Sequence, residues 1–513
     1  MFRALMILAI LFGNFYTASA ANDIDVLKKT IEATTDKTEL ARLHKKLGDH
    51  YVSQEDFKQA SGAYMKALSL SRDTFPADER VKIAVYLSWA DRLKEAIEEL
   101  DLIILENPSN LNARIHLART LSWAGQLTRS LEEADRVLKE SPENKEALLV
   151  KANALNWQGD HRTAISIFKK LLDKEEDFDS RIGLTYAFLS TGNKTGAEES
   201  SLLLKPKYPY QERELKKLID VMNRESRPKF DIRYNYYKDS DDNRLNRGAI
   251  FYSFWVDNWN LDFNYRHTDA KDKTRDKRAE DLFFKIYSKL TESVGIGGGL
   301  GFNQLGNGET RNFLTGHIRA DANISNATIG ASIARDVLSD TAQIIENRIK
   351  ITNVGLYISK PLTDRLSLYG GYNFRDYSDK NNAHDLQFVP RYAVYANPRI
   401  AVGYRFRYLN FHRQSGSGYF DPNDYISNRI FGSLYLEREK FYASMEPFIG
   451  HQYFRRNGIP TSDFIGGGAG TLGFKPKNNI AIELNAEGGN FSAGTAAGFN
   501  YYLIGIRFVY LLF

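Results

Sequence analysis

The sequence predicts a two-part α+β fold: an N-terminal α-solenoid of tetratricopeptide repeats, then a C-terminal transmembrane antiparallel β-barrel of about 16 strands. Three tryptophans, Trp89, Trp123 and Trp157, lie 34 residues apart in near-identical surroundings, which is the period of a helical repeat. After about Pro228 this period stops, and short segments that alternate apolar and polar residues continue to Phe513. An apolar leader at the N-terminus predicts export from the cytoplasm.

The composition is compatible with this division. The 513 residues allow two or three domains. A mean hydropathy of −0.44 is too polar for helical membrane spans but fits a barrel, in which only alternate residues face lipid. The net charge of +5 is too small to indicate nucleic-acid binding. The absence of cysteine excludes disulfides, cysteine-ligated metals and lipid attachment at cysteine.

Residues 1–20 are predicted to be a signal peptide. Arg3 supplies the positive charge, residues 4–15 form an apolar stretch, and residues 18–20 (Ala-Ser-Ala) are typical of a cleavage site. No later run reaches about 18 apolar residues, so insertion into a membrane has to use strands.

Residues 21–226 are predicted to form the repeat domain, with about four to five repeats and a closing helix at about 210–224. Small residues are needed where paired helices cross closely, and aromatic residues fill the holes beside them. The first unit, 41–74, has both kinds at the expected positions: Leu47, Gly48, Tyr51, Ala60, Tyr64 and Ala67. The three tryptophans are predicted to be repeat core, with stacking against a polymer as the alternative.

Residues 227–513 are predicted to form the barrel. Along 259–266 and 400–408, apolar and aromatic residues alternate with polar or charged ones, and in lipid the apolar face would point outward. Even-numbered connections are short and odd-numbered ones mostly longer, which places the repeat domain and Phe513 on the periplasmic side of a bacterial outer membrane. The sixteen predicted strands lie near 229–238, 246–256, 259–268, 280–291, 294–304, 311–322, 325–335, 345–359, 365–376, 384–395, 399–411, 426–437, 440–454, 463–474, 479–488 and 498–513.

The alternation also predicts the side chains that line the lumen and the path of a transported chain. Both signs of charge occur, and for each residue the alternative is an ion pair between strands. Mixed charge with tyrosine suits a polyhydroxylated chain, which needs hydrogen bonds and ring stacking. The predicted lumen-lining residues are Asp262, Arg266, Lys285, Lys289, Arg319, Asp321, Arg405, Arg407, Glu437, Glu446, Glu483, Glu487 and Arg507.

No catalytic residue, cofactor site or metal site is predicted. The histidines of the barrel region are scattered over separate strands and loops, and the sequence has no Gly-x-Ser-x-Gly motif. We therefore expect a protein that is not an enzyme.

Two stretches resemble motifs of the outer-membrane exopolysaccharide export porins. Residues 418–425 (Gly-Tyr-Phe-Asp-Pro-Asn-Asp-Tyr) are similar to the loop-to-strand motif Gly-Tyr-Phe/Tyr-Ser-Pro-x-x-Tyr of these barrels. Residues 374–381 are similar to their Phe-Ser-Asp-Gly-Asn turn, with Lys380 in place of the glycine. The family includes the poly-β-1,6-N-acetylglucosamine exporter and the outer-membrane subunit of cellulose secretion, and YaiO-like outer-membrane proteins share the barrel type.

The resemblance implies export of an exopolysaccharide through an outer membrane. It also implies a periplasmic repeat domain that docks the polymer or periplasmic or inner-membrane synthesis proteins, and a barrel that contacts outer-membrane lipid. Translocation of surface proteins or lipoproteins is the alternative, because such translocators also join a short helical-repeat domain to a barrel. A passive receptor or a diffusion pore stays open, although neither explains the repeats.

The connection 412–425 is predicted to be a gate or cap. Its candidate gating residues are Tyr419, Phe420 and Asp421, and the alternative is a mobile surface loop.

Overall fold

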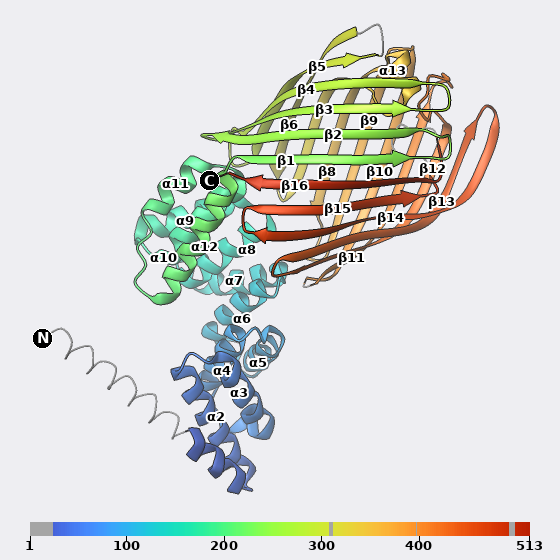
Figure 1. Cartoon of the computed structure of the whole chain (residues 1–513). Coiled ribbons are helices and arrows are strands. Elements are labelled where there is room, and N and C mark those ends of the chain that lie inside the picture. The colour runs from blue at the N-terminus through green and yellow to red at the C-terminus, as the bar shows by residue number, and fades with distance from the viewer. Residues whose placement is uncertain (1–23, 307–310, 397, 492–497, 513) are drawn as a thin grey trace, which may run out of the picture. The chain divides into compact units, whose positions relative to one another are not determined.

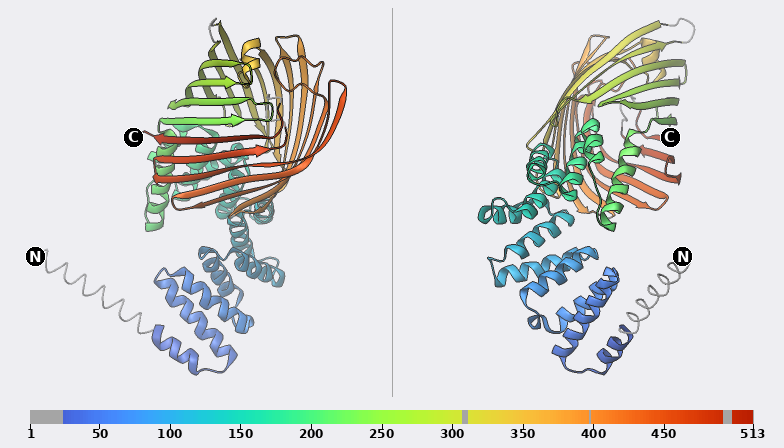
Figure 2. Two further views of the ribbon diagram at one scale, coloured as in Figure 1. Left: turned by 45° about the vertical axis from the view of Figure 1, so that its right-hand side comes forward. Right: turned by 90° about the vertical axis from the view of Figure 1, so that its left-hand side faces the viewer.

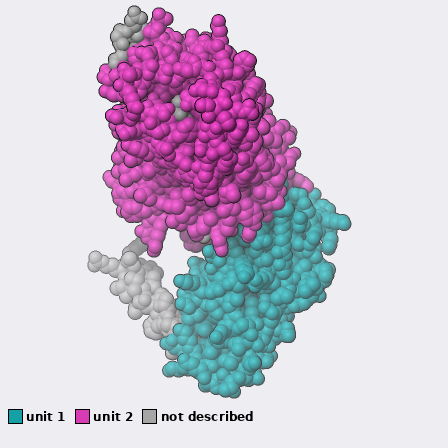
Figure 3. Space-filling view, turned by 90° about the vertical axis from the view of Figure 1, so that its right-hand side faces the viewer, with its two compact units in different colours: residues 1–158 teal, residues 159–513 magenta. Residues whose placement is uncertain are grey.

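The computed structural model describes residues 24–306, 311–396, 398–491 and 498–512. The predicted signal peptide and Phe513 lie outside the described residues. The chain divides into two compact units, residues 1–158 and 159–513, which Figure 3 colours separately. Among the described residues, the first unit is helical, and the second holds five further helices together with the barrel.

The helices of the first unit pack as pairs around small side chains. Ala60, Ala84 and Ala118 are fully buried, and a Cβ at Gly48 would lie 2.5 Å from the ring of Tyr64, so glycine allows the two helices of the first pair to approach. Residues 24–33 are helical. They are followed by α2 (Lys37–Ser53), α3 (Phe57–Ser71), η1 (Arg72–Thr74), α4 (Ala77–Trp89), α5 (Leu93–Glu106), α6 (Leu111–Trp123), α7 (Leu127–Glu140) and α8 (Lys145–Gln158).

The prediction that the three tryptophans form the repeat core is wrong. Trp89, Trp123 and Trp157 are 53 %, 42 % and 51 % exposed, and each lies in the last turn of its helix. Leu87 and Leu121, two positions earlier on α4 and α6, are fully buried instead. A residue two positions from a buried one points to another side of a helix, so the 34-residue period marks helix ends here.

The second unit begins with α9 (His161–Lys174), α10 (Phe178–Thr191), α11 (Lys194–Leu202) and α12 (Pro209–Ser226). The side chains of Asp160, Asp177 and Asn193 cap α9, α10 and α11 by accepting hydrogen bonds from first-turn backbone N–H groups. Helix α12 corresponds to the expected closing helix, and the first strand follows at Lys229. Among the described residues, none of the helices combines the length and the apolar character needed to cross a bilayer.

The described part of 229–512 contains sixteen strands that form one closed barrel (Figures 1 and 2). Each strand pairs antiparallel with its neighbours in sequence, and β1 closes the barrel against β16, with Lys229 opposite Leu511. The predicted fold is confirmed. The strands are β1 (Lys229–Lys238), β2 (Arg244–Val256), β3 (Trp259–Lys271), β4 (Asp276–Lys289), β5 (Val294–Leu305), β6 (Arg311–Ile324), β7 (Ala327–Val337), β8 (Lys350–Pro361), β9 (Leu366–Tyr377), β10 (Asn381–Tyr395), β11 (Arg399–Phe411), β12 (Asn423–Arg438), β13 (Phe441–Arg456), β14 (Ile459–Lys477), β15 (Ile480–Gly489) and β16 (Tyr501–Leu511).

The two ends of the barrel differ in their connections. We call the end with the turns 257–258, 325–326, 439–440 and 478–479 the turn end, and the opposite end, with the segments 338–349 and 412–422, the loop end. One predicted loop, 455–462, is only a turn at Asn457 and Gly458. Both residues have positive φ, as an Asn-Gly hairpin turn requires, so β13 and β14 pair up to it.

The strand predicted over 345–359 is wrong at its beginning, because residues 342–347 form a short helix, α13 (Ala342–Asn347). The hydroxyl of Thr341 caps this helix by accepting from the backbone N–H of Ile344, and Arg348 ends it in the left-handed region. Burial of Ile344 and Ile345 favours the helix over an extension of β8.

Candidate transport lumen and its closure

The two faces of the barrel wall differ in polarity. Outward-facing side chains such as Leu314 and Ile430 are 73 % and 62 % exposed, which gives the apolar outer band of a transmembrane barrel. The strand register places every one of the predicted lumen-lining residues on the opposite, inner face. We call this face the inner wall.

Most of the predicted lumen residues make ion pairs on the inner wall. Among those that do not, Glu487 accepts a hydrogen bond from Tyr501 at 2.5 Å, Arg319 lies 4.4 Å from the ring centre of Tyr287, and Asp262 lies opposite Lys285 in the register. The ion pairs are Arg266–Asp281 (2.6 Å), Lys289–Asp321 (2.8 Å), Arg405–Glu446 (3.1 Å), Arg407–Asp385 (2.9 Å), Arg507–Asp231 (2.7 Å), Arg507–Glu483 (3.1 Å) and Glu437–Lys475.

Three buried carboxylates of the inner wall were not predicted: Asp231, Asp281 and Asp385. Asp385 is fully buried and accepts hydrogen bonds from both Arg375 and Arg407. The alternation along β10 would have identified it, because Asp385 is an even number of residues away from Arg391 and therefore points to the same, inner face.

The loop end of the lumen is filled by side chains. Buried apolar residues from β1 to β5, β7, β14 and β16 form one cluster, and those from β8 to β13 form a second. Helix α13 belongs to both clusters, with Ala342 and Ile345 in the first and Ile344 in the second. Because α13 contacts both halves of the wall, it lies inside the barrel at the loop end, where Figure 1 labels it. We call segment 338–349 the plug.

Charged residues hold the plug on both sides. Arg247 of β2 donates to the carbonyl of Ser339 and to the carboxylate of Asp340, both at 3.1 Å. On the other side, Glu346 of α13 pairs with Arg275 at 2.6 Å and with Lys277 at 3.1 Å. The hydrogen bonds from Arg275 and Lys277 lower the pKa of Glu346. These contacts fix the plug without a covalent link.

The candidate gating residues are buried, which contradicts the alternative of a mobile surface loop for this part of the connection. Tyr419 is 1 % exposed, stacks on Tyr377 with ring centres 4.6 Å apart, and donates its hydroxyl hydrogen to Asp379 at 2.9 Å. Phe420 lies edge-on to three aromatic rings, and Asp421 accepts a hydrogen bond from the Ser415 hydroxyl at 2.9 Å.

The connection that carries these residues also contacts the plug. The side chains of Gln343 and Asn347 donate to the carbonyl oxygens of Gly416 and Ser417 at 2.8 and 3.1 Å. A Cβ at Gly418, whose φ is +99°, would lie 2.8 Å from Gln343, so the close approach needs glycine. The two segments therefore close the loop end as one packed body.

The inner wall is open to solvent nearer the turn end. Tyr357 and Tyr369 are 37 % and 39 % exposed, and Arg391 and Arg399 are also exposed. We call the region lined by these four residues the vestibule. Sixteen strands enclose an aqueous interior unless something fills it, so the lumen is open to solvent near the turn end and filled at the loop end.

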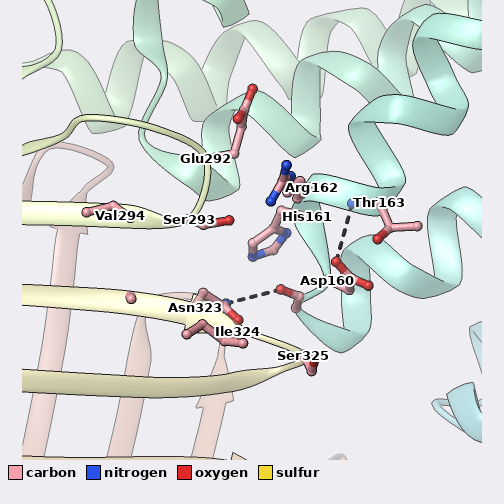
Figure 4. Close-up of a pocket in the computed structure, with 12 residues that line it drawn as sticks. Asp160, His161, Arg162, Thr163, Glu292, Ser293, Val294, Asn323, Ile324 and Ser325 are labelled. Atoms are coloured by element: carbon pink, nitrogen blue, oxygen red, sulfur yellow. Dashed lines mark hydrogen bonds between the residues drawn. The ribbon is translucent and has the colours of Figure 1, made fainter.

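The last helices are anchored to the barrel turns, all within the second unit. A pocket of about 440 Å³ separates the first turn of α9 from the turns around Ser293 and Ser325 (Figure 4). Asn323 donates across it to the carbonyl oxygen of Gly159 at 3.2 Å. Burial lowers the pKa of His161, which lines the pocket.

A second anchor is Lys194, at the start of α11. Its ammonium lies 3.9 Å from the ring centre of Trp255 and donates to the carbonyl oxygen of Glu225 at 2.9 Å. Its backbone N–H and that of Thr195 both donate to the side-chain oxygen of Asn258, in the turn between β2 and β3. Burial lowers the pKa of Lys194 to about 8, against the opposing charges of Glu225 and Glu198.

No family model matches the sequence, and a search of curated proteins finds no match. Among solved structures, the chain is similar to a bacterial polysaccharide outer membrane secretin, with 12 % identity over 56 % of this chain and 99 % of that one, at a TM-score of 0.44. It is similar to a tetratricopeptide repeat protein from Parabacteroides merdae, with 16 % identity over 41 % and 81 %, at 0.35. It is also similar to CdiB from Acinetobacter baumannii, with 12 % identity over 55 % and 60 %, at 0.40.

Proposed function

We propose that this chain is an outer-membrane porin that exports an exopolysaccharide, and that its repeat domain lies in the periplasm, where it docks partner proteins or the polymer. The observation that carries the proposal is the difference between the two ends of the lumen. The vestibule presents half-exposed tyrosines and arginines, whereas the plug and the segment 412–422 fill the loop end.

The chemistry of the vestibule suits a sugar chain. Sugar hydroxyls exchange hydrogen bonds with tyrosine and arginine, and the apolar faces of sugar rings stack on aromatic side chains. The packed loop end supports a regulated exit, because a general diffusion pore needs an open lumen. A polymer that enters from the periplasm would meet the vestibule first and the plug last.

The test is a sugar analysis of the culture medium and the periplasm from a strain that lacks this chain. We expect one polymer to disappear from the medium and to accumulate in the periplasm, and re-expression of the wild-type chain to reverse both changes. An unchanged polysaccharide profile together with loss of a surface protein would contradict the proposal and favour a translocator of surface proteins or lipoproteins.

A further inference from the structure

The inner wall has an uneven distribution of charge. Strands β10, β11 and β12 carry five inward arginines and only two inward carboxylates, Asp385 and Glu437. We call this region the arginine wall. Its arginines are Arg391, Arg399, Arg405, Arg407 and Arg429.

The nearby carboxylates are already engaged. Asp385 is shared between Arg407 and Arg375 of β9, and Glu437 pairs with Lys475 of β14. Glu446 of β13 pairs with Arg405 at 3.1 Å. These contacts leave the arginine wall with more guanidinium groups than the surrounding carboxylates neutralise.

Three of the five arginines form no ion pair with a described residue. Arg391 donates to the hydroxyl of Ser433 at 2.8 Å, and Arg399 lies 5.2 Å from the ring centre of Tyr435. Arg429 is 8 % exposed, donates to the hydroxyl of Ser427 and lies 3.9 Å from the ring centre of Phe491. It also stands directly opposite Arg405 in the register, and like charges at opposed positions destabilise a sheet.

Another part of the wall, across β15, β16 and β1, has balanced charge, so the excess of positive charge is local. Across β15, β16 and β1, Arg507 lies between Asp231 and Glu483, and Arg233 pairs with the same Asp231 at 2.7 Å. Lumen packing alone would allow complete pairing along β10 to β12 as well, but among the described residues Arg391, Arg399 and Arg429 form no ion pair there. An anionic occupant would relieve the repulsion that remains.

We propose that the arginine wall binds the acidic groups of the cargo, so that the exported polysaccharide carries carboxylates or phosphates. This inference rests on the proposed function. Guanidinium forks bind both kinds of oxyanion with paired hydrogen bonds, and the neighbouring, partly exposed ring of Tyr435 offers a stacking face for sugars. Exposed Arg399 starts β11 at the turn end, and Arg391 lies opposite Gly403, about 13 Å further along the wall.

The test uses the full-length chain in detergent and three probes of similar length: hexagalacturonate, neutral cellohexaose and a cationic chitosan hexamer. We expect hexagalacturonate to bind most tightly and its affinity to fall as salt is raised. The double variant Arg391→Ala/Arg399→Ala should weaken this binding by about tenfold or more. The control is Arg278→Ala, because Arg278 is 60 % exposed on the outward face of β4. Circular dichroism establishes that each variant is folded.

Two results would overturn the proposal in distinguishable ways. Equal binding of cellohexaose and hexagalacturonate, with no effect of the double variant, would refute an acidic cargo and leave polysaccharide export standing. Failure of all three probes to bind, with loss of a surface protein in the deletion strain, would refute both.

Discussion

At the residue scale, the second unit depends on a few buried charges that serve two elements at once. Asp385 joins arginines from β9 and β11, and Lys194 joins α11 to the end of α12 and to the barrel. A buried charge is tolerated only when it is paired or hydrogen-bonded, so removing one partner costs more than the pair contributes.

Replacement of Asp385 by alanine is expected to destabilise the barrel by about 3–5 kcal/mol, because it leaves Arg375 and Arg407 without their carboxylate. Urea unfolding of the purified chain measures the change. Asp276→Ala is the matched control, since that carboxylate is 52 % exposed and pairs with an exposed Lys271, and it should shift stability by less than about 1 kcal/mol. Equal effects of the two substitutions would contradict the role given to Asp385.

The lowered pKa of Lys194 predicts that the stability of the helices next to the barrel depends on pH. Its pKa of about 8 in the folded chain lies below the value of about 10.4 expected when unfolded. Between these values the unfolded chain holds a proton that the folded chain has released, so the free energy of unfolding rises with pH, by at most about 3 kcal/mol. Thermal unfolding followed by helical circular dichroism between pH 7 and 10.5 measures this rise.

The Lys194→Met variant isolates the contribution of this group. It keeps the length of the side chain but has no proton to release, so its stability should rise less with pH than that of the wild type. Parallel curves for the two proteins would show that Lys194 does not titrate in this range.

At the element scale, the plug is held by ionic contacts and apolar packing, and no strand includes it. Arg247 and Glu346 provide the ionic contacts on its two sides. Such a segment can leave the lumen without breaking the hydrogen bonds between strands.

Planar-bilayer conductance tests this closure. The double variant Arg247→Ala/Glu346→Gln should raise the frequency of open events over the wild type, and deletion of residues 340–348 should give a stable conductance. Arg278→Ala, on the outward face, should behave as the wild type. If the deletion stayed as non-conducting as the intact chain, the plug would not be what closes the lumen.

The elements were predictable from the sequence where one physical rule dominates. Alternation identifies strands and their inward faces because lipid selects apolar side chains at every second position. It failed at 342–347, where a side-chain cap and burial inside the lumen stabilise a short helix. The tryptophan period identified the repeats but not their core, because a repeated position need not be a buried one, as Trp89 shows at 53 % exposure.

The interior contacts were less predictable than the strands. Parity placed Arg405 and Arg407 on the inner wall, but pairs such as Arg405–Glu446 join strands two apart and depend on register. The plug contacts depend on a connection folding back into the barrel, which no local pattern encodes.

At the scale of the whole molecule, the chain combines a helical repeat with a barrel that is open to solvent near its turn end and packed at its loop end. If the cargo is a sugar polymer, the polymer has to pass Tyr369 on its way from the turn end to the plug. Tyr392, on the neighbouring strand, is 43 % exposed but faces outward, which makes it a matched control.

The decisive measurement is photo-crosslinking in living cells, with p-benzoylphenylalanine in place of Tyr369 or Tyr392. We expect the Tyr369 position to yield an adduct whose attached material a glycosidase removes. Protease treatment of that adduct should leave a peptide that still carries sugar. The Tyr392 position should yield no adduct. A protein adduct at Tyr369, resistant to glycosidase, would contradict polysaccharide export and identify a polypeptide as the cargo.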